Sequence, residues 1–253
     1  MGYVRRDASW RLSGLLLLLA CIQAPAVRAD VLISGTRFIY PAEQAEIGVT
    51  LANRGKLPVL VKAWIDEGDP AVAAERLKPP LLMTPPLARV ENGREQLFRI
   101  RYTGRADTLP QDRESLFWIN LLDVPPDPAA ARDEQPRLQL AFQYRLKLFY
   151  RPGALPGDPA AAARGLRWSI EASAHHVVAE NDAPYHVSLG RLALWSGCHA
   201  IELAPATILP HSRTPFDLPS DALLPRSDAS IRYAWIDDWG GITTEEKRLV
   251  RTH

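Results

Sequence analysis

The sequence predicts an all-β protein made of two domains, each a β-sandwich, and three observations lead to this prediction. The first is the stretch 137–152, in which every even-numbered residue from Leu138 to Tyr150 is apolar or aromatic and most odd-numbered residues are polar. Such alternation is typical of a β-strand. The second is that short apolar runs return at regular spacing between turn residues. The third is that no segment keeps a helical period.

The residues before the end of this stretch predict the first domain, over residues 30–151. Its apolar runs cover residues 31–40, 45–51, 59–65, 81–87, 97–102, 115–122 and 138–150. About seven short strands with turn signals between them are typical of an immunoglobulin-like sandwich, here without its disulfide. Pro85 and Pro86 favour a sheet edge for their run, because proline cannot donate to a strand ladder. The dense run 115–122 is expected to be buried on both faces.

Pro152 and Gly153 end the long strand, and the chain beyond them predicts a second domain. Residues 152–164 are rich in Pro, Gly and Ala, so we expect them to connect the two domains. A less regular β-sandwich is expected over residues 165–253. Its apolar runs cover residues 166–172, 177–179, 185–195, 200–203, 231–236 and 246–250, and the Pro-rich stretch 205–225 interrupts them.

Residues 1–29 have the pattern of a secretory signal peptide. Arg5, Arg6 and Arg11 form a basic start, and residues 14–22 form a short apolar segment. Val27-Arg28-Ala29 is an acceptable cleavage site. Cleavage after Ala29 would leave a chain that begins at Asp30. A membrane anchor is the alternative, but the apolar segment has about half of the roughly 20 residues that a spanning helix needs. A lipoprotein is a second alternative, because residues 18–21 resemble a lipoprotein cleavage box that would place a lipid on Cys21.

The charge of the chain gives no support for a nucleic-acid partner, and its cysteine content gives none for a disulfide framework. Removing residues 1–29 takes away four Arg and one Asp, so the formal charge changes from +1 to −2. A nearly neutral chain gives no reason to expect nucleic acid or a strongly anionic surface as a partner. Cys198 is then the one cysteine left, so no disulfide framework is expected and burial of apolar side chains must supply the stability.

The patterns expected of an enzyme or a metal protein are missing from the sequence. There is no Gly-rich phosphate loop and no Gly-x-Ser-x-Gly motif. His175 and His176 are neighbours, so on a strand they would point to opposite faces, and the same holds for Cys198 and His199 as a catalytic pair. His186 and His211 have no metal-ligand spacing. We therefore expect no catalytic residue, no metal and no cofactor.

Two cations stand out because they interrupt strongly apolar strands. Arg37 lies within the run 31–40, and Lys147 lies within the long strand. A buried cation without a partner is costly. Each side chain could therefore lie on a solvated face of its sheet, or the two together could line a cleft and bind an anion.

Four segments of the first domain resemble the signature segments of the PapD-like periplasmic pilus-assembly chaperones, in the same order and at similar spacing. They are residues 35–41, 109–120, 124–126 and 146–152. A weaker resemblance follows in the second domain, at residues 180–187, 208–210 with 215–216, and 237–241. The cysteine pair that some members carry late in the second domain is missing here.

This resemblance implies a boomerang of two immunoglobulin-like domains that acts as a periplasmic chaperone. Its partners would be pilus subunits, which are immunoglobulin-like folds lacking their last strand, and an outer-membrane usher. By the family pattern, Arg37 and Lys147 would bind the C-terminal carboxylate of a subunit. The strand lent to the subunit would present Leu138, Leu140 and Phe142, and an interdomain charge cluster would consist of Glu114, Arg151 and Asp238. The short connection from Pro126 to Leu138 is typical of the chaperones that serve rod-type pili.

Two questions stay open at this level. Strict alternation puts Lys147 on the opposite face from Leu138, Leu140 and Phe142, so either a bend or an approach from the strand edge is required. The competing function is a two-domain binding or adhesion module without chaperone activity, which rows of exposed Trp would favour. Five of the seven Trp lie within strand patterns, namely Trp64, Trp118, Trp168, Trp195 and Trp235, and the core is the expected place for them. Exposed apolar residues on the lent strand would also favour self-association of the free protein.

Overall fold

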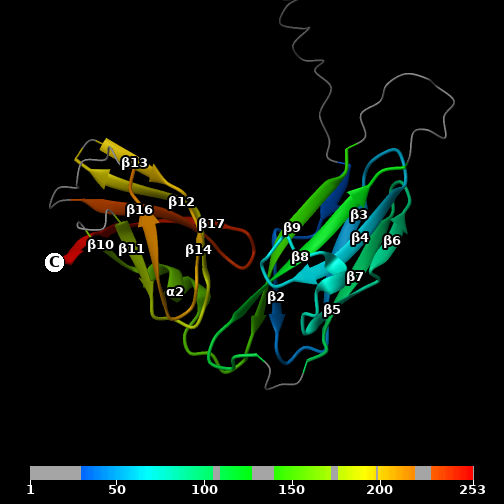
Figure 1. Ribbon diagram of the computed structural model, residues 1–253, viewed down its shortest axis with the longest axis horizontal. Coiled ribbons are helices and arrows are strands. Elements are labelled where there is room, and N and C mark those ends of the chain that lie inside the picture. The colour runs from blue at the N-terminus through cyan, green and yellow to red at the C-terminus, as the bar shows by residue number, and fades with distance from the viewer. Residues whose placement is uncertain are drawn as a thin grey trace, which may run out of the picture. The chain divides into compact units, whose positions relative to one another are not determined.

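The computed structural model describes residues 30–104, 109–126, 140–171, 176–197, 199–219 and 229–252, and nearly all its regular structure is β-strand (Figure 1). The strands form four sheets, two from residues 31–151 and two from residues 167–252. No helix in this part of the chain has both the length and the apolar character that crossing a membrane requires. The expectations for residues 1–29 with Cys21, and for Leu138, His175 and Cys198, lie outside the described residues.

Two sheets form what we call the first sandwich. One has the order β1-β3-β7-β5, with β1 at Val31–Ile33, β3 at Ile47–Asn53, β7 at Glu95–Tyr102 and β5 at Leu81–Thr84. The other has the order β2-β9-β8-β4-β6, with β2 at Arg37–Pro41, β9 at Phe142–Arg151, β8 at Ser115–Val124, β4 at Val59–Asp66 and β6 at Leu87–Val90. A short 3₁₀ helix, η1 at Ala74–Arg76, follows β4. Buried side chains from both sheets, among them Phe98 and Ile119, join in one apolar cluster, so the sheets pack face to face.

Two runs that were expected to form single strands are each split between the two sheets. The run 31–40 becomes β1 and β2, which lie in different sheets, and the run 81–87 becomes β5 and the start of β6. The second break falls at Pro85 and Pro86, which have no N–H to donate. β5 and β6 are each the last strand of their sheet, which is the edge position expected for that run.

The long strand is shorter than predicted. β9 begins at Phe142, so Leu140 and Ala141 precede it, and it ends at Arg151 as Pro152 follows. On one side β9 pairs antiparallel with β8 from Phe142 to Tyr150. On the other side it pairs with β2 in parallel, and this pairing runs only from Lys147 to Arg151. The first half of β9, residues 142–146, therefore precedes the start of β2 and does not pair with it.

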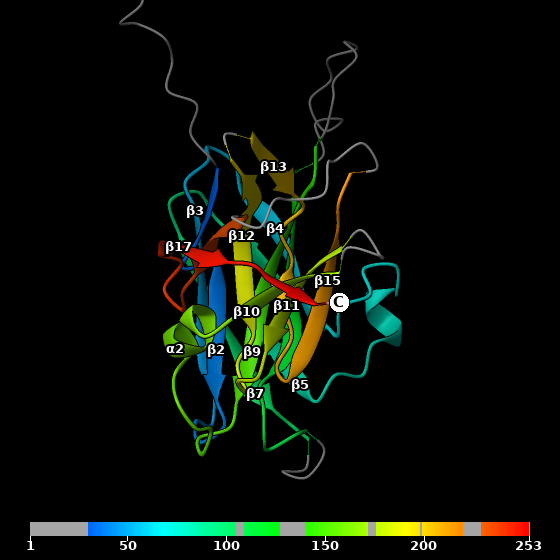
Figure 2. The ribbon, with the colours of Figure 1, turned by 90° about the vertical axis from the view of Figure 1, so that its left-hand side faces the viewer.

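The second sandwich is built from the remaining two sheets. One has the order β15-β11-β10-β18, with β15 at Ser212–Asp217, β11 at His176–Asn181, β10 at Arg167–Glu171 and β18 at Val250–Thr252. The C-terminal strand β18 lies parallel to β10 (Figure 2). The other sheet has the order β13-β12-β16-β17, with β13 at His199–Leu203, β12 at Val187–Ser196, β16 at Ser230–Ile236 and β17 at Ile242–Arg248, and β14 at Thr207–Ile208 pairs with β12. The core between these sheets contains an aromatic cluster, in which the Trp168 ring contacts both Phe216 and Tyr233.

Two stretches of the second half differ from the sequence expectation. The stretch 152–164, expected as a connection, contains the helix α2 at Pro159–Arg164. Asp158 caps it by accepting a hydrogen bond from Ala161 N at 2.7 Å, and Ala163 packs into the core of the second sandwich. The Pro-rich stretch 205–225 contains β14 and β15, where only an interruption was expected. Pro215 is compatible with β15 because that strand is at a sheet edge.

Candidate functional site

Arg37 and Lys147 lie side by side in the first sandwich. They are register partners in the parallel pair of β2 and β9, and both side chains are half-buried. Each also reaches a group of the second sandwich. Arg37 Nη1 donates to the carbonyl oxygen of Ile236 at 2.7 Å, and Lys147 Nζ donates to Ser188 Oγ at 3.0 Å and to Thr207 Oγ1. The structure thus brings together the two cations that the sequence analysis selected, at the place where the two sandwiches meet.

The electrostatics of this pair favour an anion. Burial lowers the pKa of Arg37, an effect that Asp238 and Asp237 oppose. Burial, and then the neighbouring Arg37 charge, lower the pKa of Lys147 from 10.5 to about 8. Arg37 Nε is buried and has no hydrogen-bond partner among the described residues. Two neighbouring cations whose charged forms are disfavoured would be stabilised by an added negative charge.

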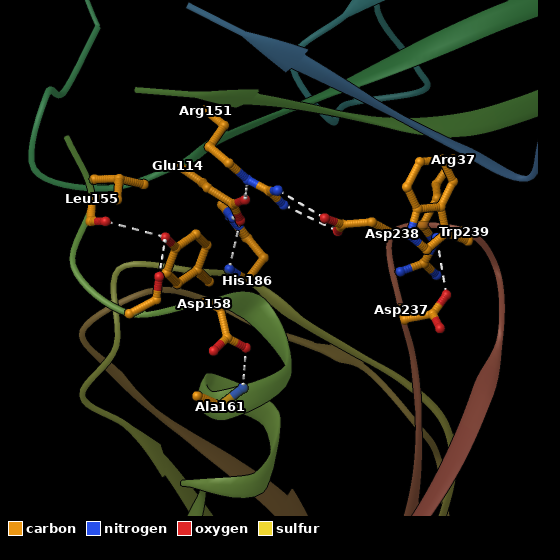
Figure 3. A network of polar contacts seen from close by, with 12 residues as sticks. Arg37, Glu114, Arg151, Leu155, Asp158, Ala161, His186, Asp237, Asp238 and Trp239 are labelled. Carbon is orange, nitrogen blue, oxygen red and sulfur yellow. Dashed lines mark hydrogen bonds and ion pairs between the residues drawn. The ribbon is translucent and has the colours of Figure 1, made fainter. Parts of the chain in front are cut away.

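Glu114, Arg151 and Asp238 form one network across the joint between the sandwiches (Figure 3). Arg151 Nε donates to Glu114 Oε1 at 2.7 Å, and its Nη1 and Nη2 donate to the two Asp238 oxygens at 2.7 and 3.0 Å. Burial by itself would lower the pKa of Arg151, but the hydrogen bonds and charges of Asp238 and Glu114 raise it. The guanidinium therefore links the start of β8 to the β16–β17 turn.

His186 is a fourth member of this network. Glu114 Oε2 accepts from His186 N at 2.8 Å and contacts His186 Nδ1 at 3.2 Å, while Glu114 N donates to the Pro184 carbonyl oxygen at 2.9 Å. The His186 ring also lies 5.4 Å from the Phe149 ring. In the sequence, His186 could be assessed only as a metal ligand, because no sequence signal connects it to Glu114. Ser188 and Thr207 were missed for the same reason.

The turn between β16 and β17 holds Asp238 in place. Asp237 Oδ1 accepts from Trp239 N at 2.9 Å and from Gly241 N at 2.7 Å, and Gly240 adopts a left-handed φ of 86° that favours glycine. Trp239 itself is 95% exposed. The segment 237–241, noted in the sequence for its resemblance, is thus a tight turn that aims one carboxylate at Arg151.

The residues expected on the lent strand are exposed where the structure describes them. Leu140 and Phe142 are 54% and 55% exposed, and Leu138 lies outside the described residues. Farther along the same face, Leu146 packs against the core and Leu148 is within it. One apolar face of β9 therefore changes from exposed at its start to buried at its end.

The opposite, polar face of β9 is tied to its neighbours. Arg145 Nη2 donates to the buried Asp66 at 2.7 Å, Gln143 Nε2 donates to Asn120 Oδ1 at 2.9 Å, and Asn120 Nδ2 donates to Asp66 Oδ2 at 2.6 Å. The Arg145 guanidinium also lies 4.4 Å from the centre of the Trp118 ring. These contacts hold the first half of β9 on the sheet while its apolar face stays exposed.

The expectation that all five strand Trp residues lie in the core is wrong for three of them. Trp168 and Trp235 are buried, but Trp64, Trp118 and Trp195 are half-buried. A cation lies over each of the three rings, namely Lys62, Arg145 and Arg232 respectively. Stacking under the aliphatic and charged parts of these residues keeps the rings on the outer faces of their sheets.

Comparison with known protein families gives two matches that together span the two sandwiches. Residues 30–156 match the N-terminal domain of PapD, described as a pili and flagellar-assembly chaperone, and residues 161–247 match the C-terminal domain of the pili assembly chaperone PapD. The chaperone protein FimB/FhaD of Bordetella pertussis is 40% identical over 235 residues, which cover 90% of this chain and 91% of the relative. The probable fimbrial chaperone YadV of Escherichia coli is 36% identical over 225 residues, covering 87% and 90%.

Solved structures agree with these matches. The crystal structure of the YadV chaperone superposes with a TM-score of 0.73 at 35% identity, covering 87% of this chain and 100% of that one. The SafB chaperone, solved in complex with the SafA pilin of Salmonella enterica, gives a TM-score of 0.70 at 26% identity, covering 88% and 99%. The chain, with its two immunoglobulin-like sandwiches, belongs to the PapD-like family of pilus-assembly chaperones.

Proposed function

We propose that this protein is a periplasmic chaperone that binds pilus subunits, completes their fold with its own strand and delivers them to an outer-membrane usher. The observation that carries this proposal is the register pair of Arg37 and Lys147 next to a strand whose apolar start is exposed. An anion site beside an open apolar strand fits a partner that ends in a carboxylate and lacks one strand. No catalytic role is assigned to any residue.

The carboxylate anchor follows from the charges. A subunit's C-terminal carboxylate placed between Arg37 and Lys147 would receive charge-assisted hydrogen bonds, including one from the unsatisfied Arg37 Nε. It would also offset the cost of keeping two cations partly buried next to each other. Because β2 begins at Arg37, the anchor lies at the boundary between residues 147–151 of β9, which pair with β2, and residues 142–146, which do not.

The lent strand is the first half of β9 with the residues before it. A subunit strand that ends at the anchor can pair with residues 142–146 of β9, which precede the start of β2, and this is an approach from the strand edge. Leu138, Leu140 and Phe142 would then enter the open groove of the subunit, and backbone groups at its unpaired edges would be satisfied. Contacts of Gln143 and Arg145 hold the polar face of β9 to its own sheet, while Leu140 and Phe142 stay exposed.

The joint of Glu114, Arg151, Asp238 and His186 would keep the two sandwiches in a fixed relation around the anchor. Without a subunit, the apolar residues of the lent strand would favour self-association of the free protein, because unpaired strand edges and exposed apolar patches bind to one another.

Export by residues 1–29, with cleavage after Ala29, would bring the protein to the compartment in which subunits need protection. The mass of the protein recovered from a periplasmic extract tests this step. A chain that begins at Asp30 supports it, and a chain with a lipid on Cys21 contradicts it.

The anchor is tested by co-expression with a pilus subunit and recovery of the complex through a tag on the chaperone. Arg37→Ala and Lys147→Ala should each abolish co-purification, because losing one partner of a desolvated charged contact costs about 2–5 kcal/mol. The exposed Lys56, changed to Ala, is the matched control and should bind subunit normally. Normal recovery of subunit with both anchor variants would refute the proposal.

A further inference from the structure

The cation pair of the first sandwich faces a pair of hydroxyl groups on the second. Ser188 of β12 and Thr207 of β14 are register partners, just as Arg37 and Lys147 are. Both hydroxyl oxygens accept hydrogen bonds from the Lys147 ammonium. Two neighbouring strands of each sandwich thus bring one pair of polar side chains to the same place. Ser188 is buried, and it lines the same pocket as Arg37.

Each of these side chains keeps a hydrogen-bond donor that no described residue uses. Arg37 Nε is buried without a partner. Lys147 donates two of its three ammonium protons to the hydroxyl oxygens. A hydroxyl group that accepts a hydrogen bond still has its own proton to donate, and within the described part of the chain neither Ser188 nor Thr207 donates it.

The carboxylates nearest to this group of donors are already engaged. Asp238 accepts hydrogen bonds from Arg151 Nη1 and Nη2, and Asp237 accepts from two backbone N–H groups of its own turn. Several donors that converge without an acceptor call for a group with several lone pairs, which a carboxylate from outside the chain supplies.

We propose that Ser188 and Thr207 complete the anion site, so that a subunit's terminal carboxylate is bound by Arg37 and Lys147 from the first sandwich and by two hydroxyl groups from the second. In the complex, each hydroxyl turns its proton to a carboxylate oxygen while its own oxygen still accepts from Lys147. The inference rests on the proposed function, since it takes the terminal carboxylate as the ligand. It implies that the anchor is complete only when both sandwiches are in place.

The test uses the last strand of the subunit that co-purifies with the chaperone, synthesised once as the free acid and once as the C-terminal amide. Ser188→Ala and Thr207→Val should each weaken binding of the free acid about tenfold or more, the effect of losing a hydrogen bond to a charged group. Binding of the amide should stay unchanged. Thr207→Ser, which keeps the hydroxyl, should restore binding, and Thr243→Val, on an exposed part of β17, serves as the matched control.

Four outcomes would overturn the inference. Unchanged binding of the free acid would show that the hydroxyl groups give nothing to the ligand, and an equal loss for acid and amide would show that they only hold the sandwiches together. A third measurement repeats Thr207→Val in a Lys147→Met background, where the loss should persist. No loss there would mean that Thr207 acts only by placing Lys147. If Lys147→Met itself fails to weaken binding of the acid, the carboxylate anchor falls, and this inference falls with it.

Discussion

Replacement of Arg151 by Ala should destabilise the protein far more than an ordinary surface change would. Glu114 has a side chain that is only 2% exposed, and Arg151 is its charged partner at 2.7 Å. Without the guanidinium, the Glu114 carboxylate would stay buried with hydrogen bonds from His186 alone. Removal of one partner of a buried ion pair costs about 3–5 kcal/mol. For a chain of this size, each kcal/mol lowers the melting temperature by about 2–4 °C, so the expected drop is about 6–20 °C.

Thermal unfolding followed by circular dichroism measures this effect, and two further variants identify its cause. Asp238→Asn removes a charge that is 29% exposed, so it should cost about 1 kcal/mol or less. Arg151→Met combined with Glu114→Gln removes both charges of the buried pair and should recover much of the loss, because no unpaired buried charge remains. Asp238 also loses Arg151 in this variant, but its side chain is 29% exposed, so that loss should be small. A melting curve of Arg151→Ala that matches Asp238→Asn would refute the reasoning, since it would mean that Glu114 needs no charged partner.

Three more predictions concern the lent strand and the anchor. Leu140→Glu should leave the melting temperature of the free chaperone within about 2 °C of wild type, because Leu140 is 54% exposed and surface changes stay within about 0.5 kcal/mol. The variant should nevertheless fail to protect a pilus subunit from degradation. Recovery of the variant only as insoluble protein would place Leu140 in the core. Asp66→Ala should remove the contacts that hold Arg145 and Asn120 at the start of β9. Amide hydrogen exchange at residues 142–146 should then speed up more than in the rest of the first sandwich. An equal increase in exchange rate across the whole first sandwich would argue against a local tether. The pKa of Lys147 is about 8 in the free protein, and a bound carboxylate favours its charged form. The affinity for subunit should therefore be at its maximum below pH 8 and fall by up to about tenfold per pH unit above it. Lys147→Met should show no such dependence on pH.

The same lowered pKa gives the opposite sign for folding. Lys147 titrates near 8 when folded and at its ordinary 10.5 when unfolded, so its charged form costs the folded state stability at every pH below about 8. That cost is relieved as the pH rises from about 8 to 10.5. Free chaperone should therefore gain stability from this group over the range in which it loses affinity for subunit.

Residue patterns within single segments allowed the strand content, the division into two halves and the family resemblance to be predicted from the sequence. Alternation over 138–150 marks a strand because successive side chains point to opposite faces. Arg37 and Lys147 could be selected because a cation within an apolar strand conflicts with its surroundings. The sequence alone left open whether these two cations lie on solvated faces or together in a site.

The tertiary structure decided which groups meet, because contacts between distant segments leave no periodic trace in a sequence. The run 31–40 is divided between two sheets, so only its second part, β2, brings Arg37 beside Lys147. Buried His186 reaches Glu114, and Ser188 and Thr207 reach Lys147, although as single polar residues they carry no sequence signal. Phe142 is exposed and Leu148 is buried although both lie on the same face of β9. This difference depends on where β2 begins and on how far the core extends, and burial of that kind is set by packing between elements rather than by the pattern within one of them.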